Sequence, residues 1–242
     1  MENHSYDDII GSSEAPYINR LVAQHGLAAN FFAETHPSLP NYIAMTSGST
    51  QGIADDNPPA DHPLDVPSIF SLLPAGASRS LQESMPSNCL RTDSGEYAVR
   101  HNPQAYYVNL GGDCAAYNVP LADPPDLSAR FTFVTPNLIH DMHDGTVAEG
   151  DSWLSVFVPK LLSSAEYAAG RTALFLTWDE ADLLGPNQIP TLVIGPSVAA
   201  GTKVAARLDH YAMLRATQEM LGVTPLLGAA ATAADLRTPF NI

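Results

Sequence analysis

Residues 173–180 read Ala-Leu-Phe-Leu-Thr-Trp-Asp-Glu, an apolar run that ends in two adjacent carboxylates. A short apolar run of this kind is typical of a strand that is buried on both faces of a parallel sheet. Ligands of open α/β sheets bind beyond the carboxyl ends of the strands, so Asp179 and Glu180 are candidate functional residues. The alternative is a solvated acidic loop, and nearby Asp182 is interpreted in that way. The run therefore indicates a parallel sheet of the α/β class, with a candidate ligand-binding site at the carboxyl end of this strand.

Further apolar runs extend this pattern along the chain. Strands are expected at 28–33, 105–108, 131–134 and 191–194, and helices at 15–24, 41–46, 68–73, 152–163 and 211–221. Strands that alternate with helices predict an α/β fold with a mostly parallel sheet covered on both faces. No repeat or linker interrupts the pattern, so residues 1–242 are expected to form one domain. The irregular stretches at 51–67 and 84–126 are expected to be long loops of the kind that often carries function.

The composition excludes several functional classes. The net charge is −15 and no cluster of lysine and arginine exists, which argues against a nucleic-acid partner. No apolar run approaches the length of a membrane span, so no integral membrane segment is expected. The same acidity would repel an anionic substrate. A phosphate site in this chain must therefore be locally positive, through a metal ion, histidine or backbone N–H groups.

A hydroxyl follows the strand expected at 28–33. Ser38 lies in the segment THPSLPNY (35–42), directly before an expected helix. Its ordinary role would be that of an N-cap, and a hydroxyl at a helix N-terminus also lies where backbone N–H groups can hold a phosphate. Thr35 is the competing hydroxyl, and the sequence favours Ser38. Because both follow strands, Ser38 and the two acids are expected at the same sheet edge.

The first residues after the initial methionine are Glu2 and Asn3, with no apolar strand before them. Such a pair would ordinarily be a solvated tail. Together with Ser38, Asp179 and Glu180, however, it supplies three carboxylates, an amide oxygen and a hydroxyl, which are the oxygen ligands that hard cations take. Coordination to a metal also turns a hydroxyl into a nucleophile. These residues therefore form a candidate site for one divalent metal ion.

Histidines are the other candidates for catalysis. His101 lies in the segment RHNP, and His210 lies in the segment DHY before an expected helix. His140 and His143, spaced at i and i+3 with acids between them, fit either a metal-binding pair or a surface turn. Below its unperturbed pKa of about 6.5, histidine could supply the positive charge that a phosphate needs here. The histidines without supporting context are His25 and His62.

Cys89 and Cys114 are the only cysteines. Two separate buried thiols are one interpretation of them. An even count in a Pro-rich chain is also what a secreted protein with one disulfide would show. Both interpretations stay open at the level of composition.

Six segments, taken in order, resemble a known family: ENHSYDDIIG (2–11), THPSLPNYIAMTSGST (35–50), VRHNP (99–103), PNLIHDMHDGTVAEGDSWL (136–154), LFLTWDEAD (174–182) and DHYAMLRATQEMLG (209–222). They resemble the bacterial phosphoesterase family of secreted acid phosphatases and phospholipases C, in the alkaline phosphatase-like superfamily. The similarity spans nearly the whole chain. The most similar subgroup contains the secreted acid phosphatases and phosphatidylinositol-3-phosphatases of actinobacteria. The resemblance implies a three-layer α/β sandwich with a mostly parallel central sheet.

The resemblance also implies roles for particular residues. The ligands of a single divalent metal ion, of a kind that the motifs do not specify, would be Glu2, Asn3, Ser38, Asp179 and Glu180. Ser38 would be the nucleophile. The histidines that line the pocket would be His101, His143 and His210. Cys89 and Cys114 would form a disulfide, as the family's secreted members often have a cysteine pair around the HNP motif.

The chain departs from the family at its N-terminus. Family members have an apolar strand directly before the Glu-Asn pair, and this chain lacks it. A sheet without that strand would expose pairing edges and apolar surface. We therefore expect an N-terminally truncated sheet, with the strand and a signal peptide lost upstream of Met1, and a secreted, extracellular location.

The expected activity is that of a metal-dependent acid phosphomonoesterase that forms a phosphoseryl intermediate. Its substrate would be a small-molecule or lipid phosphate ester. A phospholipase C-type phosphodiesterase is the nearest alternative, because it would use the same site with a different leaving group. An inactive secreted binding protein that keeps the fold is the alternative from another class. The sequence does not indicate the oligomeric state.

Overall fold

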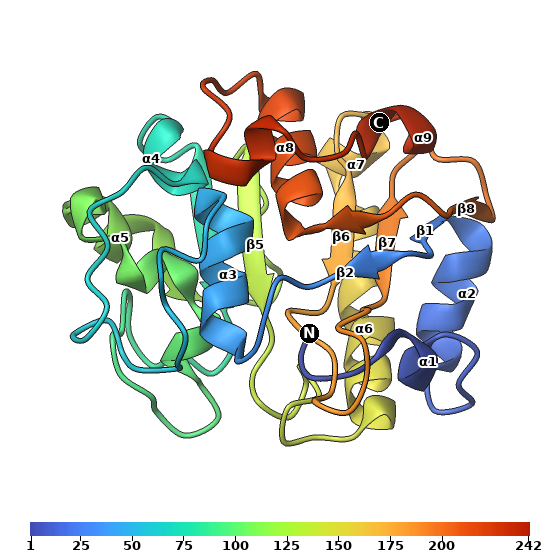
Figure 1. Ribbon diagram of the computed structural model, residues 1–242, viewed down its shortest axis with the longest axis horizontal. Coiled ribbons are helices and arrows are strands. Elements are labelled where there is room, and N and C mark those ends of the chain that lie inside the picture. The colour runs from blue at the N-terminus through green and yellow to red at the C-terminus, as the bar shows by residue number, and fades with distance from the viewer.

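The computed structural model describes residues 1–242, whose strands form three small sheets (Figure 1). The strands are β1 (Gly26–Ala28), β2 (Phe31–Phe32), β3 (Ser78–Gln82), β4 (Asn118–Pro120), β5 (Phe131–Thr135), β6 (Leu174–Thr177), β7 (Thr191–Ile194), β8 (Thr202–Val204) and β9 (Leu208–Asp209). One sheet has the order β6–β7–β1–β8, another pairs β2 with β9, and the third has the order β4–β3–β5. Four of the six pairings are parallel, and the two that β7 makes, with β1 and β6, are antiparallel. The expected α/β fold with mostly parallel pairing is confirmed, although its sheet is divided.

Helices flank these sheets on both faces (Figure 1). The α-helices are α1 (Tyr6–Ile9), α2 (Pro16–Gln24), α3 (Ser38–Ser47), α4 (Ile69–Leu72), α5 (Gly112–Tyr117), α6 (Val147–Leu162), α7 (Ala165–Ala168), α8 (His210–Leu221) and α9 (Arg237–Phe240). Short 3-10 helices are η1 (Val99–His101), η2 (Pro103–Tyr106), η3 (Val108–Leu110) and η4 (Gly228–Ala231). Helix α2 packs against α6, and α3 packs against α8. The long helices thus form two pairs around the strands.

Local sequence signals fix the ends of the helices that surround the site. Helix α6 begins at a capping box, in which the Thr146 hydroxyl accepts from the N–H of Glu149 and the Glu149 carboxylate accepts from the N–H of Thr146. The Asp209 carboxylate caps α8. Helices α3 and α8 end at Gly48 and Gly222, both in the left-handed conformation that glycine adopts without strain.

Most of the elements predicted from the sequence are present. The strands at 131–134, 173–178 and 191–194 correspond to β5, β6 and β7, all five helices exist, and the run 28–33 forms part of β1 and all of β2. The strand expected at 105–108 is wrong. Residues 105, 106 and 108 belong to η2 and η3, and Tyr107 between them makes only an isolated bridge to Leu64, because Pro103, which fixes its own φ and lacks an N–H, opens a helical turn there. The sequence does not reveal β3, whose segment SRSLQ contains a single aliphatic side chain.

The middle of the fold contains a groove where two strands face each other without pairing. Strands β5 and β6 are each the last strand of their sheet, and no strand of the chain lies between them. Both line one cavity of about 520 Å³, which we call the central groove. Buried hydrophobic side chains form two separate clusters, one centred on β1, β6 and β7 and the other on α3 and the 3-10 helices. Strands β5 and β6 thus each border the groove with one unpaired edge.

The two cysteines are joined in a disulfide. Their Cα atoms lie 5.5 Å apart, within the usual range, and neither thiol is free. The interpretation as two separate buried thiols is therefore wrong. The bridge ties the loop after β3 to α5.

None of the helices combines the length and apolarity that crossing a bilayer requires.

Candidate active site

The first residues of the chain are built into the sheet edge. The Met1 nitrogen donates to the Thr177 carbonyl at 3.1 Å, and the Asp179 N–H donates to the Met1 carbonyl at 3.0 Å. On the other side, the Glu2 N–H donates to the Asp141 carbonyl at 2.8 Å. Glu2 is completely buried as a result. The interpretation of Glu2-Asn3 as a solvated tail is therefore wrong.

Ser38 is placed among the carboxylates by the turn that precedes α3. It is the first residue of that helix and is 2% exposed. Its hydroxyl lies 3.1 Å from Glu2 Oε2 and 3.2 Å from Glu180 Oε1. The Asn41 side chain holds the turn by accepting from two N–H groups and donating to two carbonyls of residues 34–37. The competing hydroxyl, Thr35, instead donates to the adjacent His36 carbonyl.

The N-terminus of α3 is only partly free to bind an anion. The Leu39 N–H, in the first turn, already donates to the Asp56 carboxylate at 2.9 Å. An acid at this position uses the helix N-terminus that a phosphate would otherwise favour. A phosphate beside Ser38 could therefore bind only to those N–H groups of the first turn that Asp56 does not occupy.

Three carboxylates crowd around Ser38 in a space with little water. Burial raises the pKa of Glu2 well above its usual value, and the Asp179 and Asp141 carboxylates add to the rise. Burial likewise raises the pKa of Asp179, and it raises that of Glu180 to about 8 with a further contribution from Asp179. Like charges this close disfavour one another's ionised form. A cation bound among them would remove that repulsion.

The donor atoms present fit a divalent ion. Asn3 Oδ1 and Asp179 Oδ2 are buried and have no hydrogen-bond partner. Asn3 has a positive φ of 53°, a left-handed conformation that asparagine adopts more readily than most residues, and its N–H lies 3.4 Å from Asp179 Oδ1. Oxygen atoms of carboxylates, an amide and a hydroxyl are what hard cations prefer. A second grouping, of Glu2, His101 and Asp141, brings ligand atoms within 4.8 Å of one another and could also bind a metal.

His101 connects two of these acids. Its Nδ1 lies 3.1 Å from Asp141 Oδ2 and its Nε2 lies 3.3 Å from Glu2 Oε2. The ring also stacks on Tyr42, whose hydroxyl donates to Glu2. A carboxylate on Nδ1 favours the tautomer with its proton on that atom, which leaves Nε2 to interact with the site. Burial lowers the pKa of His101 despite the opposing effect of Asp141.

His143 and His210 lie on different sides of this centre. The His143 ring lies 5.6 Å from that of His101, with its Nδ1 on Asp144 and its Nε2 3.1 Å from the Arg100 guanidinium. His210 is fully buried and its Nε2 contacts the Asp179 carbonyl at 2.7 Å. Burial lowers the pKa of His210 to about 4.

Burial therefore weighs against His101 and His210 as sources of the positive charge that the sequence leads us to expect from histidine. Burial lowers the pKa of both, because removing a charge from water costs more than the nearby acceptors return. The permanent cation near the site is Arg100, which the sequence does not single out beyond its place beside His101. His143, half-exposed beside that guanidinium, is the histidine best placed to reach a substrate.

Three residues of the site are not identified from the sequence. His36 contacts Glu180 through its Nδ1, Tyr42 contacts Glu2, and Asp141 contacts His101. Tyr42 follows Ser38 by four residues, so the i, i+4 spacing on α3 could have indicated it. Asp141 lies between His140 and His143 in sequence, whereas nothing in the sequence distinguishes His36 as a partner of Glu180.

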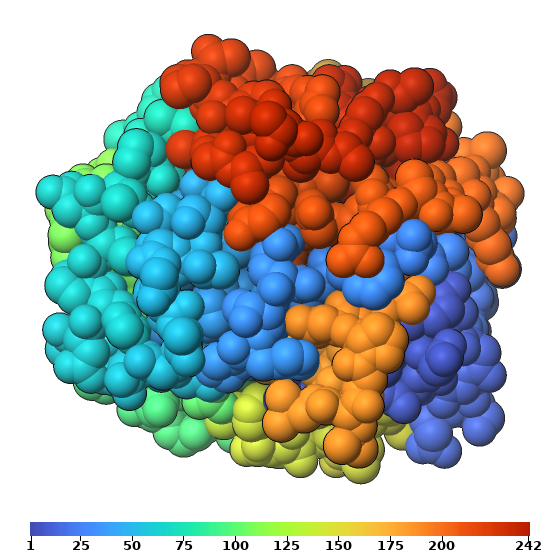
Figure 2. Space-filling view, in the orientation of Figure 1, coloured from blue at the N-terminus to red at the C-terminus, as the bar shows by residue number.

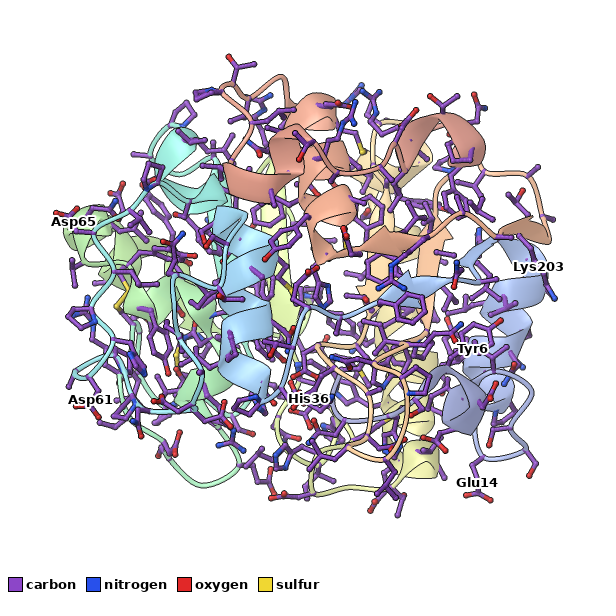
Figure 3. All side chains as sticks on the ribbon, in the orientation of Figure 1. Tyr6, Glu14, His36, Asp61, Asp65 and Lys203 are labelled. Atoms are coloured by element: carbon purple, nitrogen blue, oxygen red, sulfur yellow. A yellow bond between two sulfur atoms is a disulfide. The ribbon has the colours of Figure 1, made fainter.

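The remaining candidates lie outside the site. His140 Nδ1 contacts Glu83 rather than pairing with His143, so the metal-binding interpretation of that pair is not supported. His62 contacts Asp55, and His25 ends α2. Asp182 is a loop acid, as expected, and accepts from the Ser5 hydroxyl. His36 lies beside the start of α3, whereas Asp61 and Asp65 lie at the periphery (Figure 3).

Two distant segments of the chain are bonded to each other beside the site. The Asn187 side chain donates to the Thr35 carbonyl and the Ala33 N–H donates to the Asn187 carbonyl. Figure 2 shows the same junction on the surface, where the blue segment around residues 30–40 meets the light-orange loop around residues 180–190. The loop after β6 and the turn before α3 therefore hold each other in place.

Comparison with solved structures defines the class of fold. A protein of the alkaline phosphatase superfamily from Vibrio parahaemolyticus superposes with a TM-score of 0.61 at 13% identity, over 94% of this chain and 66% of that chain. A phosphonate monoester hydrolase from Silicibacter pomeroyi superposes with a TM-score of 0.64 at 11% identity, over 99% of this chain and 75% of that chain. The fold is thus that of the alkaline phosphatase superfamily.

Sequence comparison then places the chain more narrowly. Residues 12–224 match the model of the Phosphoesterase family, so the chain belongs to that family. A phosphatidylinositol-3-phosphatase of Mycobacterium tuberculosis is 35% identical over 240 residues, which cover 96% of this chain and 78% of that protein. An acid phosphatase of Aspergillus fumigatus is 28% identical over 252 residues, covering 94% of this chain and 54% of that protein. The chain thus spans about half the length of this fungal relative. This chain is therefore a hydrolase of the class that acts on phosphoric esters.

Proposed function

We propose that the chain is a metal-dependent acid phosphomonoesterase that uses Ser38 as its nucleophile. The observation that carries the proposal is the position of the Ser38 hydroxyl, which is buried and within 3.2 Å of carboxylate oxygens of both Glu2 and Glu180. A hydroxyl in this position has acceptors for its proton on two sides. The remaining loop hydroxyl, that of Thr35, has none of these contacts.

The residues that would hold the metal ion are Glu2, Asn3, Ser38, Asp179 and Glu180. Two of their buried oxygen atoms, Asn3 Oδ1 and Asp179 Oδ2, have no other partner, which supports this assignment. When bound, a divalent ion lowers the pKa of a coordinated hydroxyl and neutralises charge on a phosphoryl group. His101 would act through Glu2, since it lies between Glu2 and Asp141 and fixes the orientation of that carboxylate.

The chemistry would proceed in two steps. Ser38 Oγ attacks phosphorus while its proton passes to a neighbouring carboxylate, and the bond between phosphorus and the ester oxygen breaks. A water molecule then forms a bond to the same phosphorus and gives a proton to the group that protonated the alcohol. The serine–phosphate bond breaks, Ser38 Oγ takes back its proton from the carboxylate, and inorganic phosphate leaves. Phosphoryl transfer is catalysed mainly by positioning the reacting groups and by stabilising the charge of the transition state. The buried setting of Ser38 supports this positioning.

Arg100 and His143 are the groups that would meet the substrate. They form a pair, with the guanidinium 3.1 Å from His143 Nε2, and His143 is partly exposed. In a chain with net charge −15, a fixed cation at the mouth offsets repulsion of a phosphate. His143 Nε2 accepts from Arg100 in this structure. Once the guanidinium turns to the phosphate, that nitrogen would be free to bind a proton and pass it to the leaving alcohol, whereas His210 would orient the Asp179 backbone and take no part in proton transfer.

The proposed substrate is a phosphate monoester, either small or the headgroup of a lipid. The similarity to a phosphatidylinositol-3-phosphatase supports the lipid form, and the similarity to acid phosphatases supports the small form. The proposed location is extracellular, because the disulfide between Cys89 and Cys114 fits an oxidising compartment. We also propose that residues 1–242 act as one domain, because the site takes residues from both halves of the chain.

The proposal is tested by removing, one at a time, the hydroxyl groups of Ser38 and Thr35. We expect Ser38→Ala to reduce turnover of p-nitrophenyl phosphate by at least about 1,000-fold, as removal of a catalytic nucleophile does. Thr35→Ala, the matched control, should keep turnover near that of the parent. Acid quenching during turnover should trap phosphate on the peptide that contains Ser38, as detected by mass spectrometry.

The same assay separates the proposal from its rivals. Faster hydrolysis of p-nitrophenyl phosphocholine than of p-nitrophenyl phosphate would indicate a phosphodiesterase of the phospholipase C type. Activity that survives in Ser38→Ala and disappears in Thr35→Ala would show that the nucleophile is assigned wrongly. Absence of turnover with every ester in the presence of Mg²⁺, Mn²⁺, Zn²⁺ or Ca²⁺ would favour an inactive binding protein.

A further inference from the structure

The loop between β5 and α6, residues 136–146, carries two side chains of the candidate site (Figure 1). Asp141 Oδ2 lies 3.1 Å from His101 Nδ1, and the His143 ring lies beside the Arg100 guanidinium. The two residues are also bonded to each other, because the His143 N–H donates to Asp141 Oδ1 at 2.8 Å. Whatever fixes the position of this loop therefore fixes both side chains.

The backbone between these two residues has a conformation that few side chains adopt. Met142 has a positive φ of 81°, although it is neither glycine nor asparagine, and it is 1% exposed. Its side chain fills space that Gly150 of α6 leaves open, since a Cβ on Gly150 would lie 2.5 Å from both Cγ and Cε of Met142. A strained residue of this kind persists only where the surrounding structure holds it from several sides. The loop therefore depends on contacts from outside it.

One carboxylate outside the loop accepts from three donors. Glu83, the residue directly after β3, accepts from the Asn137 N–H at 3.0 Å and from the Trp153 indole N–H at 3.0 Å. His140 Nδ1 lies 2.9 and 3.0 Å from its two oxygen atoms, and it carries a proton there because a carboxylate accepts and does not donate. The His140 ring also stacks on Trp153. Glu83 thus joins the end of β3 to the loop and to α6.

Hydrogen bonds continue this connection to the site. Asn137 Oδ1 accepts from the His140 N–H at 2.9 Å, and the Asn137 carbonyl accepts from the Asp141 N–H at 2.8 Å. His140 directly precedes Asp141 in the chain. The contacts of the Glu83 carboxylate are with the loop and with α6, and none of them reaches Ser38. Any effect of Glu83 on catalysis must therefore act through the loop.

We propose that Glu83 is a positioning residue for phosphoric ester hydrolysis, which holds Asp141 against His101 and keeps His143 on the substrate side of the site. Without this carboxylate, three donors lose their acceptor and the strained loop backbone is free to relax. A displacement of about 1 Å in a catalytic group is enough to cost about 100-fold in rate. This role rests on the proposed function in one respect, the assignment of His143 as the proton donor to the leaving alcohol.

The kinetic test compares two esters that differ in their need for that proton. Phenolate is a strong base, so phenyl phosphate gains from a proton donor, whereas p-nitrophenolate is a stable anion that leaves without one. We expect Glu83→Ala to reduce turnover of phenyl phosphate by at least about tenfold more than turnover of p-nitrophenyl phosphate, because general acid catalysis contributes about 100-fold or more where it is needed. Partial unfolding, in contrast, would reduce both rates by the same factor. His143→Asn should show the same preference as Glu83→Ala.

The matched control is Glu219→Ala. The Glu219 side chain is covered to a similar extent, 29% exposed against 20% for Glu83, and it contacts Arg215 and Arg237 rather than the loop. Its removal should change the two rates by equal factors. Glu83→Gln keeps the size of the side chain and one acceptor oxygen, so it should show the preference of Glu83→Ala to a smaller extent. It replaces Glu83→Ala if circular dichroism shows that the alanine variant is unfolded.

Amide hydrogen exchange tests the position of the loop without any turnover. The N–H groups of Asp141 and His143 donate to the Asn137 carbonyl and to the Asp141 carboxylate. In Glu83→Ala both should exchange at least about tenfold faster than in the parent, as they do when a segment opens locally. Glu219→Ala should leave these two rates unchanged.

The two measurements separate the possible outcomes. Unchanged exchange at Asp141 and His143 in Glu83→Ala would overturn the proposal, whatever the rates of hydrolysis. Equal loss of the two rates in Glu83→Ala, while His143→Asn distinguishes the esters, would overturn it as well. If exchange becomes faster but His143→Asn does not distinguish the esters, Glu83 does position the loop, and the assignment of His143 as proton donor is what fails.

Discussion

Strands β6 and β7 are neighbours of equal length in one sheet, yet their surroundings differ sharply. Strand β7 pairs on both sides, with β6 and β1, and its four residues are completely buried. Strand β6 pairs on one side, and its other edge lines the central groove. Both are apolar in sequence, so composition does not set the difference. Burial depends on what lies beside a strand, and a missing neighbour leaves no trace in the strand itself.

The carboxyl end of β6 contrasts with its open edge. Asp179 and Glu180 are buried there and are held by residues from distant segments: Met1 on the backbone, His210 on the Asp179 carbonyl, and Ser38 on the Glu180 carboxylate. The site is therefore fixed by its loops and by the helix that Ser38 begins.

The largest expected effect is at this carboxyl end. Asp179→Asn should reduce turnover by at least about 100-fold in saturating divalent ion, because even residues that only orient metal ligands cost 10–100-fold when changed. With a chelator present, the same change should raise the thermal midpoint, since it removes one of three crowded carboxylates. Enzyme assays and thermal scans measure both. Asp182→Asn, outside the site, is the control; a fall in midpoint for Asp179→Asn under chelation would contradict the crowding argument.

The next test compares the two strands directly. Leu192→Ala in β7 removes a completely buried side chain and should lower the free energy of unfolding by about 2–5 kcal/mol. Leu174→Ala in β6, at a half-buried position beside the groove, should cost about 1 kcal/mol. Urea denaturation of both variants gives the two values. Equal losses would mean that the groove is closed in solution and that β6 is as well covered as β7.

The disulfide should matter on the other side of the groove. The double variant Cys89→Ser and Cys114→Ser should lower the free energy of unfolding by about 3 kcal/mol, mainly by releasing a constraint on the unfolded chain. The bridge closes a loop that contains His101, so reduction should also loosen the Asp141–His101 contact. Denaturation with and without reductant tests the first effect, and the parent under reductant serves as the matched comparison. If the double variant is as stable as the parent, the disulfide is dispensable for folding stability.

Much of the fold follows from local patterns in the sequence. Apolar runs predict β5, β6 and β7 because each is flanked by turn residues and is too short for a helix. Strand β3 escapes this reasoning, because its buried Ser78, Ser80 and Gln82 are polar and are accommodated by the surrounding structure. The segment at 105–108 misleads in the opposite direction, since a buried aromatic run looks the same in a 3-10 helix as in a strand.

The site was predictable where chemistry and sheet geometry coincide. Ser38, Asp179 and Glu180 follow strands and meet at one edge. The oxygen ligands of Glu2 and Asn3 complete a set that suits a hard cation, and the family resemblance implies the same five residues. The contacts of Tyr42, Asp141 and His36 arise from packing between distant segments, which single residues in a sequence do not indicate. Electrostatics was the least predictable part. The histidines look like candidate cations in the sequence, and only the structure shows that burial lowers the pKa of His101 and His210.

The smallest expected effect concerns pH and the unliganded carboxylates. Burial raises the pKa of Glu180 from 4.5 to about 8 and that of Glu34 to about 7. A carboxyl whose folded pKa is raised holds a proton that the unfolded chain has already lost, so its contribution to stability fades as pH rises through the folded pKa. His210 acts in the opposite sense, because its depressed pKa of about 4 costs stability below its usual 6.5. Above pH 6.5 that contribution is constant.

Stability of the chelated protein should therefore fall between about pH 6.5 and 8, the window in which the raised carboxyls ionise and histidine no longer titrates. Glu34→Gln should remove the part of this fall that arises away from the site, because Glu34 contacts the Asp209 and Arg207 region rather than Ser38. Saturating divalent ion should flatten what remains, since it stabilises the ionised carboxylates. Urea midpoints measured at half-unit steps, with and without the ion, give the slope. A fall of the same size in both conditions would show that these carboxylates do not bind the ion, and would separate the crowded site from any metal chemistry.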